Sequence, residues 1–198
     1  MRAPDNRPPR RLQARRSQTG VTIVEFALLV LVFFAFIIGV IDMARLMFLY
    51  NTLQETTRRA ANGAAVTDPG NSALMDKVRQ KAIFRDSEGG LVLMAGLTDR
   101  AIRIDYLSVA RDASGVYSMQ VNAAAATSSE AANRRACLID PYGPSCVRLV
   151  RARVCDPQFT ATCEPMKMRS SIRFFNFQIP LPVATTIAKA QSFAQGAN

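Results

Sequence analysis

The chain has 198 residues and a formal net charge of +10, and it contains no histidine. The lack of histidine removes the commonest general base and the commonest metal ligand, which argues against an enzyme and predicts neither a cofactor nor a metal. The first 20 residues carry six arginines and one acid, a net charge of +5 directly before an apolar run. This uneven distribution argues against a nucleic-acid-binding protein, which usually spreads its basic groups over a folded face.

Residues 21–41 form the first predicted element, a membrane-spanning helix. Thr22 and Glu25 are its only polar side chains, and every residue from 26 to 41 is apolar or glycine. A helix of this length spans about 30 Å, the thickness of a bilayer core. A buried helix of a soluble protein is the alternative, but few small domains could surround such a segment on all sides. Since positive charge stays in the cytoplasm, the basic segment 1–20 predicts a cytoplasmic N-terminus.

A secretory signal peptide would also begin basic and then turn apolar. Its apolar core is shorter, however, and is followed by a cleavage site made of small residues. The run in this chain is longer, and the sequence GVIDMARL at its far end offers no such site. We therefore expect signal peptidase to leave the apolar segment in place.

The start of the apolar run carries a recognisable motif. A basic leader, Gly20, four further residues and Glu25 resemble the processing site of a type IV prepilin or pseudopilin. The stretch VEFALLV, followed by GVIDMARLMFLYNTLQETTRRAANGAA, is similar to the TadE-like minor pseudopilins of tight-adherence (Flp) systems. Many relatives have a proline a few residues after the leucines, and this chain has none. The similarity covers residues 15–66 and extends weakly to a strand-like region over residues 177–193.

The resemblance implies cleavage between Gly20 and Val21 by a prepilin peptidase, a membrane-embedded aspartic peptidase, on the cytoplasmic side. It further implies a non-enzymatic role in the assembly or capping of a Flp-type type IV pilus. The implied location is the bacterial inner membrane, with a single pass, a cytoplasmic N-terminus and a periplasmic head that could be incorporated in a surface pilus. The implied partners are the prepilin peptidase, other minor pseudopilins, the major pilin, the inner-membrane secretion platform and membrane lipid, without nucleic acid.

Two alternatives to this function stay open. One is a permanently anchored single-pass protein whose periplasmic head binds a ligand or a partner in the envelope. Under that interpretation Gly20 and Glu25 have no special role. The other is a pseudopilin of a type II secretion system, whose processing site usually has phenylalanine where Val21 stands here.

Glu25 calls for a specific role, since a charge at the centre of a membrane helix costs about 2.5–3.5 kcal/mol. Cleavage after Gly20 would create an amino group on Val21, four residues from Glu25 and on the same helix face. Glu25 could then pair with its own terminus or with that of a neighbouring subunit, which would fix the axial register of the subunits. Alternatively, Glu25 lies only at the level of the lipid headgroups.

The helical pattern continues over residues 42–66, an extracytoplasmic extension without proline. An apolar stripe with a spacing of three and four residues predicts the face that packs on a head domain. This stripe comprises Leu46, Tyr50, Leu53, Thr57, Ala60 and Ala64. Pro69 and Gly70 then end the helix. A continuous helix over residues 21–66 would be about 70 Å long.

Residues 67–198 are predicted to form an α+β head, with a small antiparallel sheet packed on the long helix. Its predicted helix covers residues 72–85, with Ser72 near the N-cap, and residues 122–136 are interpreted as a flexible connection or a helix. An alternating pattern predicts a strand over 101–109, and a turn over 111–115 leads into a second strand over 116–121, which makes a hairpin. Later strands are predicted over 148–154 and 171–179. The pairs Arg58–Arg59 and Arg134–Arg135 and the stretch 166–169 are expected on solvated or ion-paired faces. At least two of Phe174, Phe175 and Phe177 are expected in the core.

Four cysteines fall within 27 residues of the extracytoplasmic part: Cys137, Cys146, Cys155 and Cys163. An even number in an oxidising compartment predicts two disulfides. Pairing of nearest neighbours is the simplest of three connectivities, and the sequence does not choose among them. A four-cysteine zinc site is the alternative. Such sites usually use cysteines separated by two to four residues, whereas the intervening stretches here have eight, eight and seven.

Overall fold

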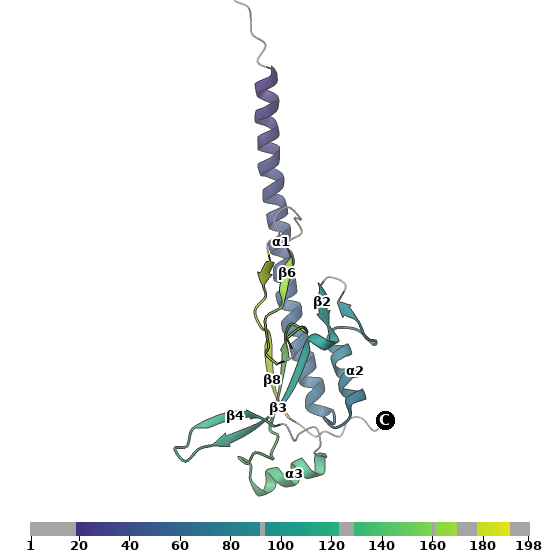
Figure 1. Cartoon of the computed structure of the whole chain (residues 1–198), viewed down its shortest axis with the longest axis vertical. Coiled ribbons are helices and arrows are strands. Elements are labelled where there is room, and N and C mark those ends of the chain that lie inside the picture. Colours follow the sequence, from purple (N-terminus) through teal and green to yellow (C-terminus); the bar gives the residue numbers. More distant parts are fainter. Residues whose placement is uncertain (1–18, 92–93, 123–128, 160, 170–177, 191–198) are drawn as a thin grey trace, which may run out of the picture. The chain divides into compact units, whose positions relative to one another are not determined.

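The computed structural model describes residues 19–91, 94–122, 129–159, 161–169 and 178–190. It has the predicted α+β architecture, with a long N-terminal helix and small antiparallel sheets (Figure 1). The chain divides into two compact units, Met1–Met43 and Ala44–Asn198. Helix α1, Thr19–Val66, contributes to both units, and its 48 residues confirm the continuous helix predicted over residues 21–66.

The first unit contains the apolar part of α1. Most of its large side chains are exposed, 69% at Val21 and 71% at Phe36, while Val30, Ile37 and Ile38 are half-buried. Within Gly20–Val66, the most apolar window of 18 residues has none of its residues buried. The helix is therefore long and apolar enough to cross a membrane.

In the second unit, the part of α1 from Ala44 onward forms the centre of the core. Leu53, Thr57, Ala60 and Ala64 of the predicted stripe are buried. The prediction for Tyr50 is wrong, because this side chain is 40% exposed and Leu49 is buried in its place. Positions 49 and 50 lie three and four residues after Leu46, so helical spacing alone allowed either of them.

Helix α2, Ser72–Ala82, packs closely against α1. A Cβ atom added to Gly63 would lie 3.0 Å from Cγ1 of Val78, so glycine permits the close approach of the two helices. The N-cap is Asn71, directly before the predicted Ser72, and its side-chain oxygen accepts a hydrogen bond from the N–H of Leu74 at 3.1 Å. The helix also ends three residues earlier than predicted, just before Phe84 adopts a positive φ of 61°.

The main sheet has the strand order β4-β3-β5-β8 and is antiparallel throughout. It consists of β3 (Ile102–Arg111), β4 (Tyr117–Val121), β5 (Leu149–Val154) and β8 (Thr185–Lys189). The first three confirm the strands predicted over residues 101–109, 116–121 and 148–154, including the hairpin. Strand β8 lies in the strand-like C-terminal region.

Alternation along β5 explains how the sheet packs. Val150, Ala152 and Val154 are buried, while Arg151 and Arg153 are half-buried on the other face. The buried residues of β5 share two core clusters with α1. Residues of α1 in these clusters are Leu49, Leu53, Ala60, Ala61, Ala64 and Ala65. One face of the sheet therefore covers α1 and the opposite face is available for other contacts.

Short elements complete the head. Strands β1 (Gly90–Leu91) and β2 (Met94–Thr98) pair with each other, as do β6 (Lys167–Arg169) and β7 (Gln178–Pro180). A 3-10 turn, η1 (Asp99–Ala101), precedes β3, and α3 covers Glu130–Ile139. Helix α3 confirms the helical interpretation for part of residues 122–136.

Two predictions for the head concern the stretch 166–169 and the strand 171–179. In the stretch 166–169 Lys167 is on a solvated face, as predicted, whereas the side chains of Met166 and Met168 are only 6% and 4% exposed. Both methionines belong to the larger core cluster, Met168 from β6 and Met166 from the position just before that strand. Of the predicted strand 171–179, only residues 178 and 179 are described, as part of β7. Phe174, Phe175 and Phe177 lie outside the described residues.

Candidate functional site

The predicted cleavage site lies in the first described turn of α1. Gly20 and Val21 are both helical and exposed, and a Cβ atom added to Gly20 would meet no heavy atom within 4 Å. Helical packing within the described residues therefore does not require glycine at this position. A requirement for glycine would have to come from an enzyme that acts on the Gly20–Val21 bond.

Glu25 lies one helical turn beyond Val21. It is exposed, and no hydrogen bond or ion pair to its carboxylate occurs within the described part of the chain. Residues four apart on a helix share a face, so an amino group on Val21 would be a neighbour of this carboxylate. The position is compatible with either of the two predicted partners, the terminus of the same chain or that of a neighbouring subunit.

The polar face of α1 in the second unit carries an ion-pair network. Arg58 and Arg59 both donate hydrogen bonds to Glu55, each with a shortest distance of 2.8 Å. These bonds, first from Arg58 and then from Arg59, lower the pKa of Glu55 to about 2. Arg59 also lies over the ring of Phe84, with 4.2 Å between its central carbon and the ring centroid. The prediction that Arg58–Arg59 is an ion-paired surface is confirmed.

The four cysteines form two disulfides, Cys137–Cys146 and Cys155–Cys163. The structure thus selects the nearest-neighbour connectivity among the three that the sequence left open. No thiol remains among these cysteines to hold zinc, and the described residues contain no cluster of three or more potential metal ligands.

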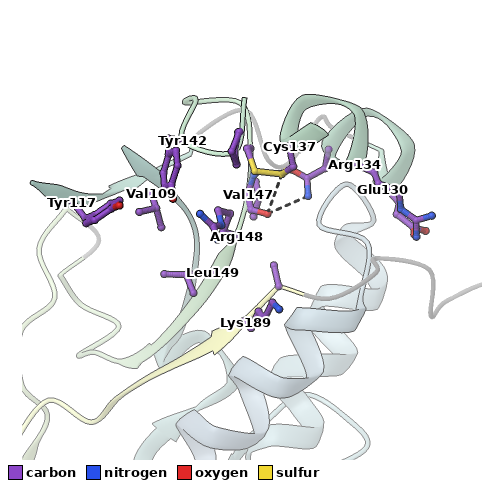
Figure 2. A pocket seen from close by; sticks show the side chains of 14 residues that line it. Val109, Tyr117, Glu130, Arg134, Cys137, Tyr142, Val147, Arg148, Leu149 and Lys189 are labelled. Carbon is purple, nitrogen blue, oxygen red and sulfur yellow. Dashed lines mark hydrogen bonds and ion pairs between the residues drawn. A yellow bond between two sulfur atoms is a disulfide. The ribbon is translucent and has the colours of Figure 1, made fainter. Parts of the chain in front are cut away.

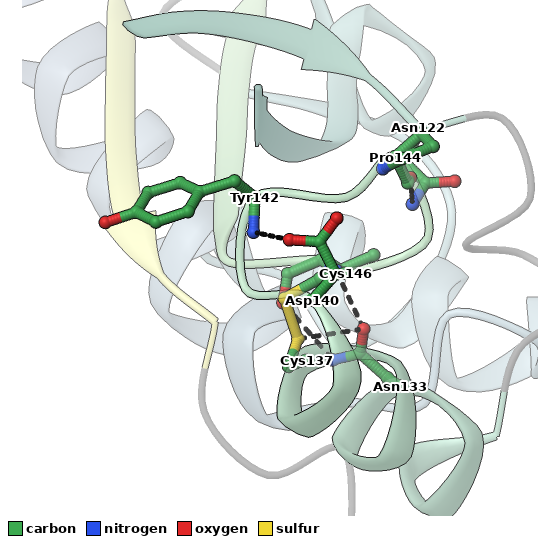
Figure 3. The surroundings of a disulfide bond; sticks show 8 residues. Asn122, Asn133, Cys137, Asp140, Tyr142, Pro144 and Cys146 are labelled. Carbon is green, nitrogen blue, oxygen red and sulfur yellow. Dashed lines mark hydrogen bonds between the residues drawn. A yellow bond between two sulfur atoms is a disulfide. The ribbon is translucent and has the colours of Figure 1, made fainter. Parts of the chain in front are cut away.

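The Cys137–Cys146 disulfide joins α3 to the loop that precedes β5, and Asn133 reinforces this junction (Figure 3). The Asn133 side chain is buried, with its oxygen accepting from the N–H of Val147 at 2.7 Å and its nitrogen donating to the Val147 carbonyl at 3.2 Å. The loop is further fixed by Asn122, whose amide donates to the Pro144 carbonyl at 2.8 Å. The pair Arg134–Arg135 contributes an ion pair from Arg134 to Glu130 at 2.6 Å.

Taken together, these features define an α+β protein whose N-terminal helix has an exposed apolar segment of membrane-spanning length and a glycine–glutamate motif at its start. Residues 20–62 match the family model described as TadE-like protein. The match begins at Gly20, includes Glu25, and confirms over this segment the resemblance inferred from the motif. No curated protein and no solved structure matches the chain.

Sequence reasoning missed one arrangement in the head. Tyr117 of β4 and Tyr142 of the disulfide loop have ring centroids 5.6 Å apart. The two tyrosines are 25 positions apart in the sequence, and no pattern in the chain links them. The four cysteines were the only available signal, since the Cys137–Cys146 bond fixes the loop that carries Tyr142.

Proposed function

We propose that this chain is a minor pseudopilin that takes part in the assembly or capping of a Flp-type tight-adherence pilus. In this proposal a prepilin peptidase removes the leader after Gly20, and the apolar part of α1 remains on the mature protein. The observation that carries the proposal is the family match over residues 20–62, which begins at the glycine of the predicted cleavage site.

The surface of α1 supports a role in packing with other apolar helices. Most side chains from Val21 to Phe36 are exposed, so lipid or neighbouring helices must surround them in a cell. Glu25 is the one carboxylate in this stretch. A carboxylate without a partner is costly in lipid, and an amino terminus on Val21 of a neighbouring subunit would offset that cost. Its role would be the registration of subunits rather than catalysis.

The proposed membrane topology follows from charge. The basic leader would stay in the cytoplasm and the head would lie in the periplasm, where both disulfides could form. The proposed partners are the prepilin peptidase, other minor pseudopilins, the major pilin and the secretion platform of the inner membrane. The rival function is a permanent anchor whose periplasmic head binds a ligand or an envelope partner.

Deletion and complementation in the native organism test this proposal. Surface filaments are sheared from cells and the major pilin in that fraction is measured by immunoblot. We expect deletion to remove pilin from the sheared fraction while the cellular pool remains, and the wild-type gene to restore it. An unchanged amount of surface pilin in the deletion strain would favour the permanent anchor and contradict the proposal.

A further inference from the structure

An open pocket of about 700 Å³ lies beside the Cys137–Cys146 disulfide. It is formed by the outer face of the main sheet, the disulfide loop and α3. Figure 2 shows Tyr117 and Tyr142 on one side of the pocket and Glu130 and Arg134 on the opposite side. This volume is in the range of sites that bind small molecules or single units of a polymer.

Two arginines and two tyrosines form a row of contacts, in which Tyr117, Tyr142 and Arg148 line the pocket and Arg111 lies next to Tyr117. The guanidinium of Arg111 lies 5.7 Å from the centroid of the Tyr117 ring, Tyr117 contacts Tyr142, and Arg148 lies 5.5 Å from the centroid of the Tyr142 ring. A cation–π contact with a ring orients a guanidinium but leaves its N–H groups unused. The tyrosines link the β3–β4 hairpin to a loop that a disulfide already fixes, so the row is held in place before any ligand binds.

The pocket carries a net positive charge. Its lining contains Arg134, Arg148 and Lys189 with one carboxylate, Glu130, which is already paired with Arg134. Arg148, Lys189 and the nearby Arg111 have no carboxylate within 4.0 Å among the residues that the structure describes. Arg148 and Lys189 are both exposed. The two cations are therefore available to an anion that enters the pocket.

We propose that this pocket binds a carboxylate-bearing sugar, such as a uronic acid unit of an acidic polysaccharide. Arg148 and Lys189 would donate charge-assisted hydrogen bonds to the carboxylate. The rings of Tyr117 and Tyr142, 56% and 37% exposed, would contact the C–H groups of the pyranose ring. This site would give the head an adhesive function that goes beyond the proposed role in pilus assembly and does not depend on leader cleavage.

The combination of groups favours a sugar acid over an acidic peptide. A glutamate side chain offers its carboxylate on a flexible chain and has no apolar face to place against an aromatic ring. A uronate holds its carboxylate rigidly beside such a face, so it can use the cations and the rings at once with little loss of entropy. Charge alone would not distinguish the two ligands, and the test must therefore compare them.

Isothermal titration calorimetry with the full chain in detergent micelles makes this comparison. The probes are trigalacturonate, its methyl ester and triglutamate. We expect wild-type protein to bind trigalacturonate and the neutral methyl ester to bind at least about tenfold more weakly, since a charged hydrogen bond is lost. Triglutamate, which matches the charge but has no pyranose rings, is expected to bind more weakly than trigalacturonate.

Variants at exposed positions assign the binding to this pocket. Arg148→Gln and Lys189→Gln should each weaken trigalacturonate binding about tenfold, and Tyr117→Leu should also weaken it. Lys77→Gln, which removes an exposed charge from α2 outside the pocket, is the matched control and should bind normally. Thiol alkylation confirms that each variant retains both disulfides.

Three results would overturn the proposal. They are no binding of trigalacturonate to the wild type, unchanged binding to Arg148→Gln and Lys189→Gln, and equal or tighter binding of triglutamate. The first two would show that the pocket is not a site for this ligand, and the third would show that charge alone is recognised. None of these results bears on cleavage after Gly20, so this inference and the proposed function fail separately.

Discussion

Thr57 of α1 and Thr186 of β8 share a hydrogen bond of 2.8 Å between their hydroxyl oxygens, across 129 positions of sequence. Thr57 also donates to the carbonyl of Gln54 at 2.9 Å, so its oxygen accepts the proton of Thr186. Thr57 is fully buried. The contact ties the last strand of the main sheet directly to the long helix.

Removal of one partner of this pair should destabilise the head. We expect Thr57→Val or Thr186→Val to lower the free energy of unfolding by about 1 kcal/mol, because each substitution removes the hydrogen bond between the two hydroxyls. The double variant should lose less than the sum of the two single variants. Chemical unfolding of the full chain in detergent, followed by circular dichroism, measures this coupling. Strict additivity would show that the hydroxyls do not interact.

Tyr106 of β3 makes a second polar contact with α1. Its buried hydroxyl donates to the carbonyl of Ala64 at 3.1 Å, and burial, followed by the charge of Asp68, raises the pKa of Tyr106 well above its usual value. In the unfolded chain the hydroxyl ionises near pH 10. Its stabilising contribution is therefore complete below about pH 10 and declines as the pH rises above that value.

Tyr106→Phe should reduce this alkaline loss of stability. We expect the variant to be about 1 kcal/mol less stable than the wild type at pH 7, since the hydrogen bond to Ala64 is lost. The difference should narrow above about pH 10, because phenylalanine has no proton to lose. Tyr50→Phe, at an exposed ring of α1, serves as the control. Parallel stability profiles for the wild type and Tyr106→Phe from pH 8 to 11 would contradict this account.

The Cys155–Cys163 disulfide should stabilise the end of β5. Cys155 is buried, and its N–H donates to the carbonyl of Ala101 at 2.9 Å. The double variant Cys155→Ser/Cys163→Ser should unfold at lower temperature, with a loss of about 2–3 kcal/mol for a loop of this size. Alkylation of the unreduced wild type from membranes should label no cysteine. Four labelled cysteines would show that the bonds are absent in the cell.

Glu25 should matter for association rather than for insertion. We expect Glu25→Val to enter the membrane normally, since it removes a charge from an apolar segment, but to lose co-purification with other pilins. Thr22→Val removes the only other polar side chain of this segment and is the matched control. Membrane fractionation and affinity purification measure the two properties. Unchanged co-purification of Glu25→Val would rule out the docking role.

Periodic patterns predicted most of the regular structure. The apolar run and the stripe that follows it predicted α1, and alternation predicted β3, because burial of one face leaves a period of 3.6 or 2 in the sequence. Strand β4, which is exposed at every position, was predicted instead from the turn that precedes it. Strand β6 is too short to show such a pattern, so the burial of Met168 and of Met166 just before the strand was not predicted. Helix α2 begins at Ser72, as predicted, and Asn71 just before it supplies the N-cap.

Among the candidate sites, those defined by a local motif could be predicted and those formed by tertiary contacts could not. Gly20 and Glu25 belong to a local motif, which a single sequence displays in full. The pairing of the four cysteines and the contact between Tyr117 and Tyr142 are tertiary, and composition and spacing allowed several arrangements of them. The aromatic pocket therefore became visible only when the hairpin and the disulfide loop were placed side by side.

N-terminal sequencing of the protein from cells with and without a cognate prepilin peptidase tests the central claim most directly. A chain that starts at Val21 only when the peptidase is present is the predicted result. Gly20→Asp should stay full-length, and the control Gly39→Ala should be processed. An added Cβ meets no heavy atom within 4 Å at either glycine, so a difference in processing would reflect the peptidase rather than packing. A start at Met1 or Arg2 in both strains would contradict the account and make this chain a permanently anchored protein.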